Sequence, residues 1–499
     1  MSFDALPTEL DNQILSCLDH DGLNAMSQTS KAYRTITEPF LYRDLELKTG
    51  NHVSIRWLVV TLLYRPEVAA YIKKIDIREA GPTNQDNKVV LWSGELGPTQ
   101  RQSAVLEQHL SRLHEIMINA LGPDSDMAGL RITWIGAVLA DDHVEGSLAL
   151  IVYLAIHLQS LVFGGEMRRG VVTGYHGERL TSIMWAIYTR SCKRYGHDKA
   201  IVSPDACAFA KLYHIHLTTR SAVRIMALPN LRTMRIEGCD ELRISHNFST
   251  CASHRLESLE IVDTLGSVYD IRELFENNHT RDLKRLVFRK FSIDPKEPFQ
   301  PVVNTLLTNC SYLEYFELSA HEEFIDPDPE PLRDLYGLNN LKELRIDVDF
   351  LVSVEDRMGL LGLNKLLPPN LEKLHVTGIC AFEFCDFVER LIVPLYHTQS
   401  GLARICEFAS LVSLKSAIVT IDFRTDFEDE WNEIAPVLIH IAAVLWAEVK
   451  LSFSVYGSAR GNETEDKLLI DHEGGSEISV FFHGLEGDEL AASELSESE

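Results

Sequence analysis

The chain has 499 residues, with 47 Lys and Arg against 73 Asp and Glu, so its formal net charge is −26. Its apolar share of 45% and charged share of 24% are close to those of soluble globular proteins, which excludes wholesale disorder. The excess of acidic residues argues against nucleic acid or an anionic membrane as the main partner, because both need a basic surface.

Neither the N-terminal residues nor the longest apolar runs have the features of a targeting signal or a membrane-spanning segment. Met1–Leu10 holds two acidic residues and no apolar run, so no signal peptide is expected. The longest apolar runs, Leu148–Leu158 and Ile434–Ala447, are shorter than the roughly 20 residues that cross a bilayer. The nine cysteines include no Cys-x-x-Cys pair. We therefore expect a soluble protein of the cytoplasm or nucleus, with free thiols, no metal and no cofactor.

Residues 3–47 are expected to form three short helices. Pro7 suits a first helical turn, and the segment from Asp19 to Gly22 breaks the first helix. The apolar positions that recur at helical spacing are Leu10, Ile14 and Leu18, then Leu23, Met26 and Tyr33, then Phe40, Leu41, Tyr42 and Leu45, after Pro39. Three short helices cannot bury all of these among themselves, so the surplus implies a partner, either the rest of the chain or another protein.

The order of these residues resembles the F-box motif, in the divergent form common in fungi. The family pattern is Leu-Pro-x-Glu-Leu, an Ile and Leu one turn later, a Leu-rich second helix, a Ser-Lys or Cys-Arg pair before an aromatic residue, and Pro-x-Leu-Tyr/Trp. The matching stretches are Leu6-Pro7-Thr8-Glu9-Leu10, Ile14-Leu15, Ser30-Lys31-Ala32-Tyr33 and Pro39-Phe40-Leu41-Tyr42. Asp11 and Asn12 depart from it, because many members are apolar there.

The resemblance implies that this segment docks on the Skp-type adaptor of a cullin–RING ubiquitin ligase through apolar anchors. The residues that it places at adaptor-binding positions are Leu6, Pro7, Leu10, Ile14, Leu18, Leu23, Met26, Pro39, Leu41 and Tyr42. Some of them must instead hold the three helices together, and the sequence does not separate the two groups. The alternative is a helical cap that shields the first repeat of a solenoid.

Residues 48–222 are expected to be mostly helical, with scattered strands, as a leading part of a repeat region. The expected helices are Val53–Tyr64, Ala104–Leu121 and Leu148–Leu158. The expected strands are 72–77, 158–163 and 212–217, and Gly81–Thr99 is expected to be a loop.

Residues 223–483 contain six segments with the pattern Leu-x-x-Φ-x-Φ, where Φ is apolar. They start at Leu231, Leu256, Leu283, Leu313, Leu341 and Leu371, at spacings of 25, 27, 30, 28 and 30 residues. Helix-like stretches such as Val268–Asn277 and Pro301–Thr308 lie between them. This pattern is typical of leucine-rich repeats, in which one short strand per repeat is followed by a return helix. The expected fold class is therefore α/β: a three-helix F-box followed by an irregular solenoid with a curved parallel sheet.

The x positions of each strand are expected on the concave face of that sheet, where such arrays usually bind a partner. The residues that we expect to contact a target protein are Arg235, Glu237, Glu260, Arg285, Arg289, Tyr315, Glu317, Arg345, Asp347, Lys373 and His375. A solvated polar face is the alternative for each of them.

Beyond the repeats the pattern loosens. Residues 411–419, 449–456 and 477–483 suggest strands, and Glu433–Trp446 suggests an apolar helix. Residues 484–499 contain acids but no basic residue, and we expect a disordered tail.

No catalytic or phosphate-binding motif is present in the sequence. His214 and His216 are a possible metal pair, but no third ligand is evident. The hypothesis is a non-catalytic substrate-recognition subunit of an SCF-type ubiquitin ligase, which binds the adaptor, through it the cullin, and a target protein. A leucine-rich-repeat scaffold outside any ligase is the first alternative, and a hydrolase that uses a Cys or His of residues 48–222 is the second.

Overall fold

The computed structural model describes just over half of the chain. The described residues are 8–48, 52–78, 106–124, 127–139, 145–164, 183–184, 186–187, 190, 209–218, 223–225, 228, 230–239, 242–244, 256–276, 280–292, 298–320, 332–351, 367–380, 413, 415–423, 452–459, 467–472 and 479–480. The expected loop at Gly81–Thr99, the helix at Glu433–Trp446 and the acidic tail at 484–499 lie outside them.

The chain divides into two compact units. The first comprises Met1–Glu297, Thr308–Tyr312 and His321–Phe324, and the second comprises Pro298–Leu307, Leu313–Ala320 and Ile325–Glu499.

Three helices open the first unit: α1 (Thr8–Cys17), α2 (His20–Thr29) and α3 (Lys31–Leu41). The Asp19 carboxylate accepts from the N–H of Gly22 at 2.8 Å and caps α2. The Ser30 hydroxyl accepts from the N–H of Tyr33 at 3.1 Å and caps α3. Three helices were expected, but the break at Ser30 places Tyr33 on the third helix, and Pro39 lies inside α3 instead of starting it.

The sheet begins before residue 47, where we expected the first domain to end. Strand β1 (Asp44–Lys48) follows α3 after two residues and pairs in parallel with β2 (Lys74–Arg78). Leu45 and Leu47 are buried in this sheet, which corrects the placement of Leu45 on the third helix. The helices therefore pass into the sheet without a linker.

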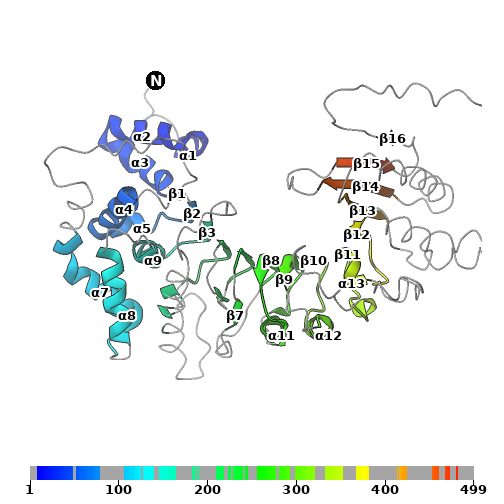
Figure 1. Cartoon of the computed structure of the whole chain (residues 1–499). Helices are drawn as coiled ribbons and strands as arrows, with labels where there is room; N and C mark the ends of the chain where they lie inside the picture. The colour runs from blue at the N-terminus through cyan, green and yellow to red at the C-terminus, as the bar shows by residue number, and fades with distance from the viewer. Residues whose placement is uncertain are drawn as a thin grey trace, which may run out of the picture. The chain divides into compact units, whose positions relative to one another are not determined.

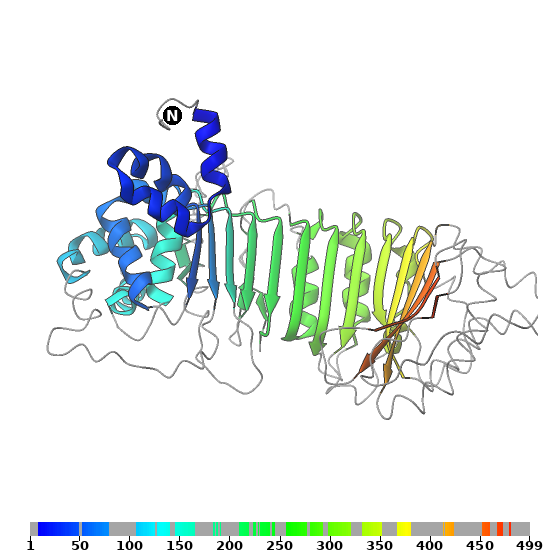
Figure 2. The same cartoon turned by 90° about the horizontal axis from the view of Figure 1, so that it is seen from above.

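Seven parallel strands form the main sheet of the first unit, each beside the strand that precedes it in the order β1, β2, β3, β4, β6, β8, β9. Figure 2 shows them side by side, from blue at β1 to green at β9. The later strands are β3 (Ser160–Gly164), β4 (His214–Thr218), β6 (Thr233–Glu237), β8 (Ser258–Leu265) and β9 (Arg285–Ser292). Two further strands, β5 (Val223–Ile225) and β7 (Leu242–Ile244), form a separate parallel pair.

Most of the remaining described helices of the first unit contact one another, and the first of them also contacts β1. The remaining helices are α4 (His52–Tyr64), α5 (Pro66–Ala69), α7 (Leu110–Leu121), α8 (Ala128–Leu139), α9 (Glu145–Leu154) and α11 (Val268–Glu276). Figure 1 shows α11 on one face of β8 and β9. α8 was not expected. Its indole at Trp134 donates to the carbonyl oxygen of Gly146 in α9 at 2.9 Å, and a Cβ on Gly146 would lie 2.7 Å from Ala137. A glycine is therefore needed where α8 and α9 approach.

The second unit repeats the parallel arrangement and ends in antiparallel strands. β10 (Tyr315–Ala320), β11 (Glu343–Asp347), β12 (Lys373–Cys380), β13 (Ser416–Phe423) and β14 (Ser452–Ala459) pair in parallel, in chain order. β15 (Lys467–His472) and β16 (Ser479–Val480) then pair antiparallel, and β15 was not expected. The described helical elements of this part of the chain are α12 (Gln300–Asn309), η7 (Leu335–Gly337) and α13 (Val348–Leu351). A mixed α/β fold built on parallel sheet is thus confirmed.

None of the helices in the described part of the chain is long and apolar enough to cross a membrane.

The residue after the first leucine of each of the six repeats alternates in charge, and Lys415, after Leu414, continues the series. These residues are Arg232, Glu257, Lys284, Glu314, Lys342, Glu372 and Lys415. In the first unit, Glu257 lies 3.9 Å from Arg232 and 3.3 Å from Lys284. In the second unit, Lys342 lies 3.0 Å from Glu314, and Lys415 lies 2.7 Å from Glu372. Charges of opposite sign therefore meet between neighbouring strands at one edge of each sheet.

Reversal of the charge at Glu257 tests this alternation. Glu257→Lys would place three cations in a row, and we expect the free energy of unfolding to fall by about 1 kcal/mol because two attractions become repulsions. Urea unfolding at low salt measures the change. Glu257→Gln, which only removes the charge, should lose about half as much. Equal stability of wild type and both variants would show that the alternation has no energetic effect.

Candidate functional site

The outer face of α1 carries an apolar stripe. Leu10 and Ile14 of α1, and Leu18 directly after its last residue, are 44%, 36% and 37% exposed, and the three recur at four-residue spacing. Leu15, on another face of the helix, is only 1% exposed and holds α1 to the rest of the unit. Leu10, Ile14 and Leu18 are named the α1 stripe below. Such an ordered apolar row in solvent marks a surface that another molecule can cover.

Of the other adaptor-binding candidates, one is buried among the helices and four are half-buried. Leu23 is buried, which puts it with the residues that hold the helices together. The half-buried candidates are Met26, Pro39, Leu41 and Tyr42, and Leu6 and Pro7 lie outside the described residues. Ile36 of α3 is exposed and was missed. A correct break at Ser30 would have revealed it as an outward position of the third helix.

Polar side chains line the opposite face of the strands from the buried leucines. In the first unit, parallel register places His216 of β4, Arg235 of β6 and Glu260 of β8 in one row. Arg235 donates to Glu237 at 2.9 Å and to Glu260 at 3.3 Å. Arg285 of β9 donates to the same Glu260 at 3.0 Å. Four of the expected target-binding residues thus form one chain of ion pairs across three strands.

A histidine extends this chain to β4. The Nε2 atom of His216 lies 3.3 Å from Oε2 of Glu237, and together with Arg235 it lowers the pKa of that carboxyl to about 2. His214, on the same strand face, has its pKa lowered by burial and by the neighbouring His216. Its Nδ1 lies 2.5 Å from Oγ1 of Thr233. The expected pair of imidazoles therefore has hydrogen-bond partners on β6. Among the described residues, no group of three His, Cys, Asp or Glu could hold a metal ion.

The second unit has its own polar cluster on its strands. The Glu317 side chain is fully buried (0% exposed) and accepts from the Tyr315 hydroxyl at 2.6 Å. Arg345 of β11 places its Nε 3.7 Å from Glu317, which supplies the compensating charge. Three more expected residues have neighbours on adjacent strands: His375 lies 2.8 Å from Oγ1 of Thr420, Lys373 lies 3.6 Å from Glu343, and Asp347 accepts from Thr377.

These two clusters account for ten of the eleven expected target-binding residues, and Arg289 lies on β9 opposite Val262. Thr233 was expected on this face as an outward position of its strand, whereas Thr420 was not expected there. Their signal was weak, because only register shows which hydroxyl faces which imidazole. The polar face is largely neutralised by its own pairs, so it offers oriented hydrogen bonds instead of a patch of one charge.

The thiols of Cys239 and Cys310 are buried. Burial raises the pKa of Cys310 to about 11, and its Sγ lies 3.8 Å from the Thr280 hydroxyl. A thiol with such a pKa is a poor nucleophile at neutral pH. Cys17, by contrast, is exposed on α1.

A scan of the chain against models of protein families and a search among curated proteins both found no match. The function therefore has to be argued from the residues and their geometry.

Acid should weaken the second unit through His375. Burial and the nearby Arg345 lower the pKa of this imidazole to about 4, from an ordinary value of 6.5. Between these two pH values the unfolded chain takes up a proton that the folded chain refuses, so the free energy of unfolding falls as the pH falls from 6.5 to 4. The loss is on the order of 2–3 kcal/mol at most.

Thermal unfolding of wild type and His375→Gln between pH 4 and pH 7 measures this effect. The variant should show a flatter pH dependence, because Gln cannot be protonated but can still bond Thr420. His20→Gln, at an exposed position of α2, is the control and should keep the wild-type slope. If the stability of wild type and of His375→Gln changed equally with pH, the lowered pKa of His375 would not be the cause of the acid sensitivity.

Proposed function

We propose that this chain is the substrate-recognition subunit of an SCF-type ubiquitin ligase. The α1 stripe docks on a Skp-type adaptor, through which the chain joins the cullin, and the polar face of the strands binds a target protein. The observation that carries this proposal is the stripe itself: Leu10, Ile14 and Leu18 remain exposed in the folded chain. Their exposure agrees with the F-box resemblance of residues 3–47, which rests on residue order alone.

The direct passage of α3 into β1 would suit a helical cap equally well. However, a cap that protects the end of an array presents polar residues to solvent. The exposed positions of α1 include polar residues such as Asn12 and Gln13, but Leu10 and Ile14 are exposed beside them, as are Leu18 after the helix and Ile36 of α3. Full burial of one such side chain is worth about 1.5–3 kcal/mol, so leaving several exposed is costly unless a partner covers them. The stripe therefore favours adaptor docking over a cap.

The role of the sheet follows from its polar face. Hydrogen bonds orient Arg235, Glu260 and Arg285 in the first unit, and Tyr315 and Glu317 in the second. A target protein of complementary polarity can be selected there by hydrogen bonding. The chain would then raise the local concentration of target lysines near the ubiquitin-charged enzyme, so it needs no nucleophile of its own. A cytoplasmic or nuclear setting, where such ligases act, belongs to the same proposal.

The alternative is a leucine-rich-repeat scaffold that uses its polar face outside any ligase. The continuity of α3 and β1 favours it, because it makes the helices part of the array. Adaptor binding separates the two functions.

Substitution of Ile14 at the centre of the stripe is the test. We expect purified wild-type chain to retain a Skp-type adaptor on a pull-down resin, and Ile14→Glu to reduce retention at least about tenfold, because a carboxylate would have to be buried in the interface. Gln13→Glu on the same helix is the matched control and should retain the adaptor. Circular dichroism should show that all three chains are equally folded.

Two results would contradict the proposal. The first is a wild-type chain that fails to retain the adaptor, and the second is retention of the adaptor by Ile14→Glu at the wild-type level. Either would leave the scaffold function as the better description.

A further inference from the structure

The connection between the N-terminal helices and the sheet consists of two residues, Tyr42 and Arg43. The carbonyl oxygen of Arg43 accepts from the backbone N–H groups of Lys73 at 2.9 Å and Lys74 at 3.0 Å, where β2 begins. The C-terminal end of α3 is therefore held by the sheet. A helix held at one end can still turn about that end, so its direction depends on a second contact.

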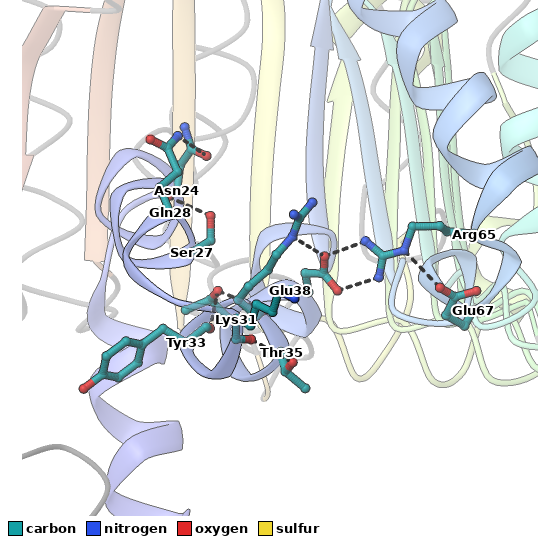
Figure 3. Close-up of polar contacts among 11 residues, drawn as sticks. Asn24, Ser27, Gln28, Lys31, Tyr33, Thr35, Glu38, Arg65 and Glu67 are labelled. Carbon is teal, nitrogen blue, oxygen red and sulfur yellow. Dashed lines mark hydrogen bonds and ion pairs between the residues drawn. The ribbon is translucent and has the colours of Figure 1, made fainter.

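That second contact is the ion pair between Glu38 of α3 and Arg65. Nη1 of Arg65 donates to Oε1 of Glu38 at 2.6 Å, and Nη2 donates to Oε2 at 2.7 Å, which is the two-pronged geometry of a guanidinium and a carboxylate (Figure 3). The Glu38 side chain is 11% exposed, so water competes little for it. Glu38 lies about one turn before the end of α3, at a distance from the backbone contacts of Arg43.

Both the backbone N–H and the guanidinium of Arg65 are hydrogen-bonded. It lies between α4 and α5, and its N–H donates to the carbonyl oxygen of Thr61. Its Nε donates to Glu67 at 3.0 Å, so each of its three side-chain nitrogens has an acceptor (Figure 3). On the other side, Arg34 donates to Glu38 at 3.1 Å, and the hydrogen bonds from Arg65 and Arg34 lower the pKa of Glu38.

We propose that Glu38 and Arg65 are positioning residues that fix the direction of the helices α1–α3, and with them the α1 stripe, relative to the sheet of the first unit. The inference rests on the proposed function for its purpose: a partner on the stripe and a partner on the polar face would then be held in one geometry. The two contacts at α3, one at its end and one a turn earlier, are what a fixed direction requires.

An Arg→Lys substitution separates direction from charge. Lys keeps the positive charge but has a single point-like head group, so it cannot hold a carboxylate in two-pronged geometry. Arg65→Lys should therefore keep the attraction between the two side chains but lose the two-pronged geometry that orients α3. Glu38→Gln removes the negative charge as well. If the pair only stabilised the fold, Arg65→Lys would largely keep its effect, because the opposite charges remain.

The test measures the distance between the helices and the sheet in the full chain. Spin labels on unnatural amino acids at the exposed positions Gln28 of α2 and Asp282 before β9 report this distance by pulsed electron resonance. We expect one narrow distribution for wild type and a distribution about twofold wider for both Arg65→Lys and Glu38→Gln. Arg272→Lys, in the exposed Arg272–Glu276 pair of α11, is the matched control and should stay narrow.

Unchanged widths in both variants would overturn the inference. Because Arg65→Lys keeps the charge, it should remain folded, and a thermal melt checks this. Glu38→Asp is a second probe with its charge intact, and it should widen the distribution because its shorter side chain no longer reaches both nitrogens.

A second readout concerns the purpose of this geometry. With adaptor, cullin and RING subunit present, ubiquitin transfer to the chain's own lysines should be confined to a few sites in wild type and spread over more sites in Arg65→Lys, with adaptor retention unchanged. If the wild type failed to bind the adaptor, the proposed function would be contradicted. The distance measurement would still test the positioning role of the ion pair. If the adaptor bound but the variants changed neither the width of the distance distribution nor the ubiquitinated sites, only the positioning role would be contradicted.

Discussion

The parallel pairing of short strands is the constraint on which the structure depends. Each strand turns alternate residues to one side, so Met234 of β6, Leu259 of β8 and Leu286 of β9 meet in one buried row. No strand can bury its row without the next strand and a covering helix. The same alternation directs the residues between them to the other face. The polar row of Arg235 and Glu260 is therefore a consequence of the buried row, and the core and the candidate binding face come from a single pattern.

The N-terminal helices differ from the sheet in this respect. Leu15 and Leu23 are buried, but the α1 stripe remains outside any core of the described residues. An ordered row of exposed apolar side chains is expensive for a protein to keep. Its presence is the reason that we propose a docking surface and not an end cap. In our proposal, the ion pair of Glu38 and Arg65 gives the stripe a defined direction relative to the sheet of the first unit.

Much of the fold could be predicted from the sequence, because the apolar residues repeat at strand spacing. The strands that follow Leu231, Leu256 and Leu283 form where the pattern places them, as β6, β8 and β9. α8 was missed because apolar residues surround its whole circumference, so no 3.6-residue period appears. β15 was missed because it carries no repeat pattern and pairs antiparallel. The break at Ser30 depends on a single capping hydroxyl, which spacing alone does not reveal.

The candidate site was predictable in part for the same reason. Outward positions of strands follow from alternation, so Arg235, Glu237 and Glu260 could be placed on one face. Which side chains pair, and that Glu317 is fully buried among outward residues, depends on neighbouring strands far apart in the sequence. The partner of Glu38 lies 27 residues away, on a turn between two helices, and no local pattern marks it.

Hydrogen–deuterium exchange of the full chain, with and without a Skp-type adaptor, tests the central claim most directly. The account predicts that a saturating adaptor slows exchange of the α1 amides, with the strands β6, β8 and β9 unaffected, because the α1 stripe is the docking surface. Unchanged exchange in α1, or protection confined to the sheet, would contradict it.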